Sequence, residues 1–168
     1  MKIAVMSDTH DHVWNVRAAV AQARRLGAEV LLHCGDLVSP FVLEELDAFP
    51  GPVHLVLGNN AGDQLLLARH CQARGGRVVH HGAFGRIEAP GGPVAWVHDP
   101  DWGRALARAG EHRLVCFGHT HRFLLEEAGG VHLLNPGELL GRKEPPGWAL
   151  VDGRDFSVTR VLLEGGRG

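Results

Sequence analysis

The feature that most constrains this chain is a series of five short, largely apolar runs, each followed at once by polar side chains. Runs of four or five such residues with polar or glycine flanks are typical of buried strands. The carboxyl ends of parallel strands line one crevice in an open α/β sheet, so polar residues that follow different strands can converge there. The five runs and the residues after them are Lys2–Met6 with Ser7-Asp8-Thr9-His10, 29–33 with Gly35-Asp36, 53–57 with Gly58-Asn59-Asn60, 94–97 with His98-Asp99, and 114–117 with Gly118-His119-Thr120-His121.

The segments between these runs predict an α/β fold. Apolar residues recur at helical spacing in residues 13–23 before Gly27, in 42–49 and in 64–74, so strands and helices alternate in the first half of the chain. The second half adds one helix over 102–109 and otherwise short strands, over 77–81, 85–88, 122–127, 131–134, 148–152 and 157–163. We therefore expect a parallel core sheet, a second sheet built from the C-terminal strands, and one domain over residues 1–168.

Composition argues against several classes of function. The formal charge is −2 and the 17 basic residues are scattered, so we expect no dedicated nucleic-acid surface. No apolar run approaches the roughly 18–20 residues of a membrane span, and an acidic residue comes too early for a signal peptide, so we expect a cytoplasmic protein without a membrane segment. The three cysteines lack metal-ligand spacing, whereas histidine occurs 12 times; nitrogen and oxygen ligands would therefore hold any metal.

The polar clusters have ordinary explanations one by one, but together they favour a metal site. Asp36 after Gly35 can cap a turn, and Asn59 suits a turn with positive φ. His119 and His121, two residues apart just past a strand, are unusual packing residues and natural metal ligands. Two divalent cations about 3.5–4 Å apart can clamp a phosphoryl group during in-line displacement and generate hydroxide from water. Such a pair needs a bridging carboxylate and a mixed shell of oxygen and imidazole ligands, which suits Mn, Fe, Zn or Ni.

The motif series as a whole resembles the calcineurin-like metallophosphoesterases, and most closely their small single-domain bacterial and archaeal phosphodiesterases. The resemblance implies a sandwich of two mixed β-sheets flanked by helices, with a dinuclear metal centre at one edge. It also implies hydrolysis of phosphodiester bonds by a hydroxide bound to that centre. The segments that carry the resemblance, between residues 1 and about 152, are Asp8-x-His10, Gly35-Asp36, Gly58-Asn59, His98, Gly118-His119-x-His121 and Leu134-Asn135-Pro136-Gly137.

The resemblance implies that three residues hold one cation, three hold the other, and one bridges the pair. These sets are, in that order, Asp8, His10 and His121; Asn59, His98 and His119; and Asp36. The implied cofactors are two divalent transition-metal ions, with Mn the first choice and Ni, Fe or Zn the alternatives.

Two positions depart from the family pattern. Many larger members carry a histidine directly after the Gly-Asn pair, as the acid that protonates the leaving oxygen. Here that position is Asn60, whose amide has no proton to give at neutral pH. Asp99 stands where a glycine usually follows the metal-binding histidine; it either lies beside the metals as a hydrogen-bond partner of a ligand or faces solvent. We expect all four tryptophans to be packing residues: Trp14, Trp96, Trp102 and Trp148.

These observations lead us to expect a metal-dependent phosphodiesterase that acts on a small phosphodiester. One alternative is a non-catalytic scaffold of the same fold, as in the metallophosphoesterase-like retromer subunit, although the filled ligand positions favour the enzyme. Another is a phosphomonoesterase or nucleotide pyrophosphatase with the same metal site, because substrate choice depends on loops such as residues 62–64 and 139–146. The sequence decides neither the natural substrate nor whether the chain forms a homo-oligomer.

Overall fold

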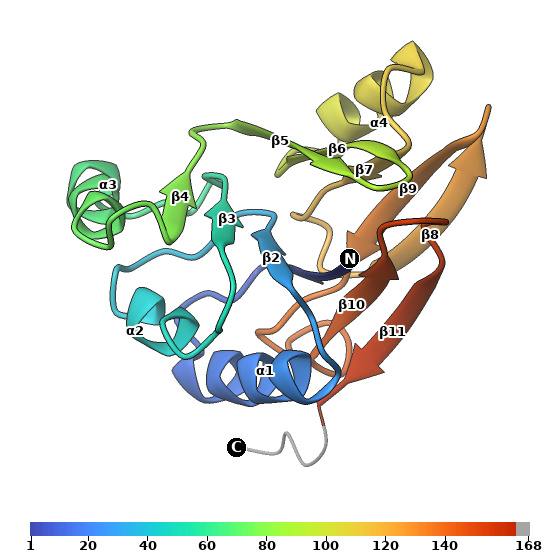
Figure 1. Cartoon of the computed structure of the whole chain (residues 1–168). Coiled ribbons are helices and arrows are strands. Elements are labelled where there is room, and N and C mark those ends of the chain that lie inside the picture. Colours follow the sequence, from blue (N-terminus) through green and yellow to red (C-terminus); the bar gives the residue numbers. More distant parts are fainter. Residues whose placement is uncertain (164–168) are drawn as a thin grey trace.

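Two mixed β-sheets stack face to face in the structure, a computed structural model that describes residues 1–163 (Figure 1). Both the α/β class and the sandwich of two mixed sheets are confirmed; residues 164–168 of the predicted domain lie outside the described residues. In spatial order the first sheet contains β11 (Val158–Leu162), β10 (Gly147–Asp152), β1 (Lys2–Met6), β2 (Val30–His33), β3 (Val53–Leu55) and β4 (Val78–His80). The second contains β5 (Phe84–Ala89), β6 (Gly92–Val97), β7 (Leu114–Cys116), β9 (Val131–Pro136) and β8 (Phe123–Ala128).

Each sheet contains a parallel group of strands with antiparallel neighbours. In the first sheet, β1 to β4 run parallel, whereas β10 pairs with β1 and β11 with β10 in the antiparallel direction. In the second, β6, β7 and β9 run parallel, and β5 and β8 are antiparallel edge strands. The parallel strands of the first sheet are linked through helices, as parallel pairs require.

The prediction that the C-terminal strands build the second sheet is wrong for the last two. β10 lies beside β1 in the first sheet, with Ala149 paired to Val5. Burial on both of its faces explains this place, because Trp148 packs in the core under the helices whereas Ala149 and Val151 pack between the sheets. The hairpin spacing of β10 and β11 is the same whichever sheet they join, so the sequence pattern could not place them.

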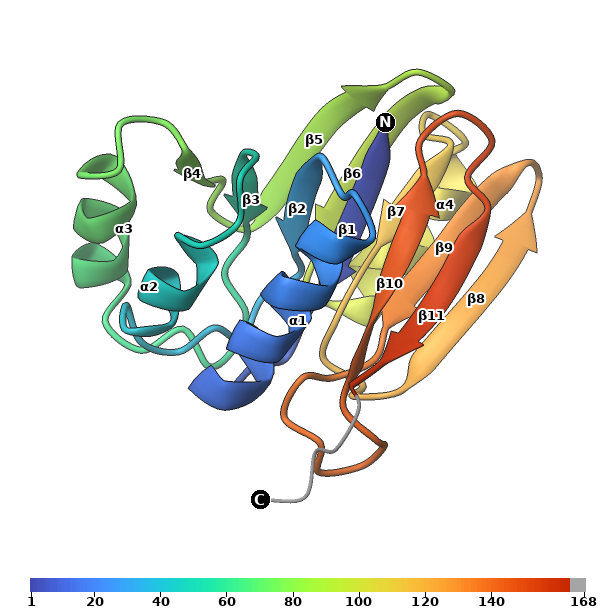
Figure 2. The same cartoon turned by 60° about the horizontal axis from the view of Figure 1, so that its bottom comes forward.

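Helices lie on the outer sides of both sheets, which gives the molecule four layers (Figure 2). α1 (Val13–Arg25) and α2 (Val42–Leu46) cover the first sheet, α3 (Gln64–Gln72) packs at its β4 edge, and α4 (Pro100–Ala109) lies against the second. β1 contributes to two cores: Ala4 and Met6 pack toward the helices, whereas Ile3 and Val5 pack between the sheets. Within residues 1–163, no helix has the length and apolar character that crossing a membrane requires.

The strands that precede the polar clusters end level with one another. Met6 pairs with His33, and His33 pairs with Leu55, so β1, β2 and β3 end together. In the second sheet, Trp96 of β6 pairs with Cys116 of β7. The residues that follow these five strands therefore converge, as expected at the carboxyl ends of parallel strands.

Candidate metal centre

Four ligand-type side chains form a compact group where the strands end. Asp8, His10, Asp36 and His121 each place a ligand atom within 4.8 Å of those of the other three. His121 Nε2 lies 3.3 Å from Asp8 Oδ1, and His10 Nε2 lies 3.4 Å from Asp36 Oδ2. The His10 and His121 rings stack, with their centroids 5.0 Å apart. Residues from the ends of β1 and β2 and from the loop after β7 thus meet at one point.

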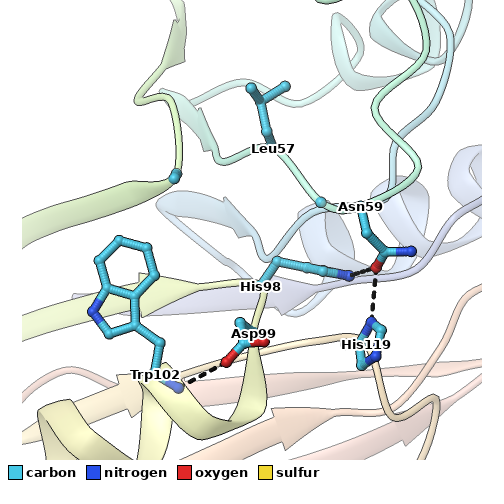
Figure 3. A pocket seen from close by; sticks show the side chains of 8 residues that line it. Leu57, Asn59, His98, Asp99, Trp102 and His119 are labelled. Atoms are coloured by element: carbon cyan, nitrogen blue, oxygen red, sulfur yellow. Dashed lines mark hydrogen bonds between the residues drawn. The ribbon is translucent and has the colours of Figure 1, made fainter.

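A second group consists of Asn59, His98 and His119 (Figure 3). Asn59 Oδ1 lies between the two rings, 2.9 Å from His98 Nε2 and 2.7 Å from His119 Nδ1. His98 Nε2 also lies 3.4 Å from Asp36 Oδ1. The two groups therefore share Asp36, whose Oδ2 faces His10 and whose Oδ1 faces His98.

A hydrogen bond on the far side of the His98 ring determines which nitrogen is free to bind a metal. His98 Nδ1 donates to the Cys34 carbonyl oxygen at 2.8 Å, which leaves the lone pair of the neutral ring on Nε2. In that neutral form Nε2 and the carbonyl oxygen of Asn59, which lie 2.9 Å apart, would both be acceptors. A cation between them would satisfy both atoms.

His10 gives a second indication that a cation fits here. Its Nε2 atom is buried and has no hydrogen-bond partner among residues 1–163, although buried polar atoms normally have one. The atom lies 3.4 Å from Asp36 Oδ2 and 3.9 Å from Asp8 Oδ1. Together the two groups offer two carboxylates, four imidazoles and an amide oxygen, which is a donor set that divalent transition metals accept.

The two carboxylates lie in different electrostatic surroundings. Burial raises the pKa of Asp8, against the opposite effect of the Ser7 hydroxyl, which donates to Oδ2 at 2.6 Å. Burial by itself would also raise the pKa of Asp36, but two hydrogen bonds from Asn60 and the nearby histidines hold that pKa below its usual value. A buried carboxylate charge is costly unless it is paired, so a bound cation would stabilise the ionised form of Asp8.

Backbone strain is concentrated at the same positions. Eight non-glycine residues among residues 1–163 have positive φ, and five of them are expected ligands. Such conformations cost about 1–3 kcal/mol each, and they persist at functional sites because the surrounding structure imposes them. The five are Asp8 (52°), His10 (41°), Asp36 (56°), His119 (69°) and His121 (62°).

Two glycines leave the room that the carboxylates occupy. A Cβ atom at Gly58 would lie 2.0 Å from Asp36 Oδ1, and one at Gly118 would lie 2.2 Å from Ser7 Oγ and 2.9 Å from Asp8 Oδ2. These distances are far shorter than van der Waals contact. The Gly-Asn and Gly-His pairs of the sequence therefore have a steric reason: any side chain at either glycine would displace a carboxylate of the site.

Glu138 is a residue of the site that the sequence reasoning missed. It is 1% exposed, and its Oε2 accepts a hydrogen bond from His121 Nδ1 at 2.5 Å, which directs His121 Nε2 toward Asp8. Its other oxygen accepts the backbone N–H groups of Lys143 and Glu144. The sequence signal for it is its place directly after Asn135-Pro136-Gly137, in a segment that carries the family resemblance.

Asn60 and Asp99, the two residues that depart from the family pattern, both form hydrogen bonds in the structure. Asn60 donates its backbone N–H to Asp36 Oδ1 and its side-chain amide to Asp36 Oδ2, each at 2.7 Å. It therefore orients the carboxylate that the two groups share. Asp99 is exposed and caps α4, because its Oδ1 accepts the backbone N–H of Trp102 at 2.8 Å. Of the two alternatives for Asp99, the solvent-facing one is correct.

The expectation that all four tryptophans are packing residues is wrong for two of them. Trp96 and Trp148 are fully buried, whereas Trp14 is 66% exposed and Trp102 is 42% exposed. Trp14 lies under the Arg17 guanidinium, 5.2 Å from it, on the surface of α1. Trp102 lines a pocket beside the second group of ligand-type residues.

Comparison with known proteins identifies relatives of the whole fold. A phosphodiesterase from Methanocaldococcus jannaschii is 31% identical over 142 residues, which cover 84% of this chain and 86% of the relative. The solved structure of an archaeal phosphodiesterase matches with a TM-score of 0.90 at 29% identity, covering 97% of this chain and 100% of that one.

A more distant structure shares the fold alone. Vps29 from Entamoeba histolytica, solved in complex with Zn²⁺, matches with a TM-score of 0.69 at 19% identity, covering 99% of this chain and 95% of that one. The family model described as the calcineurin-like phosphoesterase superfamily domain matches residues 1–155. This chain therefore belongs to the calcineurin-like phosphoesterase superfamily.

Proposed function

We propose that the protein is a metal-dependent phosphodiesterase that hydrolyses small phosphodiesters at a centre of two divalent cations. The observation that carries this proposal is the position of Asp36, whose two carboxylate oxygens face two separate groups of ligand-type atoms, 3.4 Å from His10 Nε2 and 3.4 Å from His98 Nε2. The phosphodiesterase relative from Methanocaldococcus jannaschii supports the same class of reaction.

In this proposal the seven side chains divide between two cations. When bound, such a pair supplies Lewis-acid stabilisation of the phosphoryl oxygens and activation of water at neutral pH. Mn²⁺ is the proposed metal. The protein is proposed to act in the cytoplasm. The first cation would be held by Asp8, His10 and His121, the second by Asn59, His98 and His119, and both by Asp36.

The role of Asn60 limits which esters should react well. Its amide donates to Asp36 and carries no acidic proton for the leaving oxygen. A general acid typically contributes about 10²–10⁴-fold, mostly for basic leaving groups. We therefore expect fast hydrolysis of nitrophenyl diesters, whose leaving group needs no proton, and slower hydrolysis of alkyl diesters.

Two other functions are compatible with the same fold. A phosphomonoesterase or a nucleotide pyrophosphatase would use the same centre, and a scaffold would need no centre at all. Every expected ligand position is filled, and His98 Nε2 and Asn59 Oδ1, two atoms of the kind that bind metals, lie 2.9 Å apart. Both facts favour the enzyme over the scaffold.

The test is a substrate screen with Mn²⁺-loaded protein. Bis(4-nitrophenyl) phosphate, 4-nitrophenyl phosphate and ATP represent the diester, monoester and pyrophosphate classes. We expect the highest kcat/KM for the diester, its loss in His10→Gln, and unchanged activity in His70→Gln, which alters an exposed histidine on α3. Activity on the monoester or ATP alone would assign another reaction to the centre. No activity on any of the three would contradict the enzyme.

A further inference from the structure

A pocket of about 200 Å³ opens beside the second group of ligand-type residues (Figure 3). Leu57, Ala83 and Trp102 form apolar walls, while Asn59, His98 and His119 line its side toward the centre. A phosphodiester whose phosphorus lies at the centre must direct at least one ester group outward. This pocket is adjacent to that position, and its apolar walls suit an uncharged group.

Trp102 is a preorganised aromatic surface in this pocket. Phe84 stacks against its ring, with centroids 6.1 Å apart and an angle of 24° between the planes. The backbone N–H of Trp102 donates to Asp99 Oδ1 at 2.8 Å, in the cap of α4. The ring is nevertheless 42% exposed, unlike the fully buried Trp96 and Trp148. A fixed, exposed indole offers stacking area at a low entropic cost to a planar ring that docks there.

Asp99 sets the charge of the group that this pocket can accept. Asp99 is a solvent-exposed residue of the pocket lining, and its Oδ1 accepts the hydrogen bond of the helix cap. A second phosphate placed here would meet a like charge, whereas a neutral ring with an amino group could donate a hydrogen bond to the carboxylate. The pocket therefore selects against anionic groups and in favour of neutral planar ones.

We propose that this pocket binds a neutral, planar aromatic group of the phosphodiester substrate, stacked on Trp102. The inference rests on the proposed function, because the centre holds the phosphate to which the ring is attached. It makes aryl or nucleoside phosphodiesters the substrate class and disfavours pyrophosphates. Stacking of a base on an aromatic side chain corresponds to about 5- to 150-fold in affinity.

The test measures binding of product analogues to the Mn²⁺-loaded protein by calorimetry. The probes are phenyl phosphate, adenosine 5′-monophosphate and methyl phosphate. Trp102→Ala should weaken binding of the first two about tenfold or more and leave methyl phosphate unchanged, and Trp102→Phe should restore most of the loss. Trp14→Ala, at an exposed tryptophan outside the pocket, is the matched control and should change nothing.

Asp99→Asn keeps a capping side chain and removes its charge. This variant should bind inorganic pyrophosphate more tightly than the wild type does. If the wild type binds adenosine 5′-monophosphate more tightly than phenyl phosphate and the variant does not, the pocket is assigned to a nucleobase. If Trp102→Ala binds phenyl phosphate as the wild type does, or weakens methyl phosphate equally, the pocket inference is wrong. If the wild type hydrolyses no phosphodiester, the proposed function fails, and the calorimetry still decides whether the pocket binds rings.

Discussion

Replacing Glu138 by glutamine should weaken metal binding without unfolding the protein. Glu138 Oε2 accepts from His121 Nδ1 at 2.5 Å, and His121 Nε2 faces Asp8 Oδ1 at 3.3 Å, so the carboxylate orients one expected ligand and makes it more basic. Burial by itself would raise the pKa of Glu138, but hydrogen bonds from His121, Glu144 and Lys143 hold it below its usual value. The group therefore accepts as an anion.

The size of the effect follows from what glutamine retains. Its amide oxygen can still accept from one donor, but it has no charge, and its NH₂ group faces a donor on the other side. Loss of such an orienting partner typically costs 10–100-fold in metal affinity, or about 1.4–2.7 kcal/mol. Glu138→Ala would also remove the acceptor of the backbone N–H groups of Lys143 and Glu144, so glutamine is the cleaner change.

The assay is calorimetric titration of metal-free protein with Mn²⁺, supported by the visible spectrum of the Co²⁺ form, which reports ligand geometry. Glu144→Gln is the matched control: this carboxylate lies in the same loop and binds Arg160 at 2.6 Å, but none of its hydrogen bonds involves a ligand-type residue of the centre. The reasoning is refuted if both variants lose the same affinity, or if Glu138→Gln binds Mn²⁺ as tightly as the wild type.

Three further results are expected. Asp36→Asn should lose more activity than the roughly 10–100-fold typical of a residue that only orients a ligand; unchanged turnover would mean that the shared carboxylate is misassigned. Gly58→Ala should reduce both metal content and activity, because its Cβ would lie 2.0 Å from Asp36 Oδ1; metal analysis with circular dichroism separates this from unfolding. Burial lowers the pKa of His33 to about 3, so the unfolded chain binds a proton below pH 6.5 that the folded chain does not. Urea unfolding in EDTA should therefore show the free energy of unfolding falling by about 1.4 kcal/mol per pH unit from this group as pH drops from 6.5 toward 3. His33→Asn, which keeps an acceptor for the Gly35 N–H, should remove that slope; an unchanged slope would contradict the assignment.

Local patterns in the sequence predicted the elements and the convergence of the candidate site. β1 was predicted with its observed bounds, because five largely apolar residues end abruptly at Ser7-Asp8. The polar residues after five strands were expected to meet, and the structure brings them into two groups that share Asp36. This expectation needed only the rule that parallel strands end at one edge.

What the sequence could not provide depends on contacts between distant segments. The sheet that β10 joins is decided by burial on both of its faces, which a hairpin spacing does not encode. Glu138 reaches His121 across 17 positions of the chain, and no spacing rule links them. Trp102 lines the pocket because α4 packs against the second sheet with this residue on its uncovered side. An aromatic residue in a helical segment does not indicate by itself which face of the helix other elements cover.

The most direct test of the central claim is anomalous diffraction at an X-ray energy just above the Mn absorption edge, from crystals grown with excess Mn²⁺. Two peaks about 3.5–4 Å apart are expected, both in contact with Asp36, one beside His10 and His121 and the other beside His98 and His119. No peak, or a single peak that leaves one of these histidine pairs empty at saturating Mn²⁺, would contradict a centre of two cations that share Asp36.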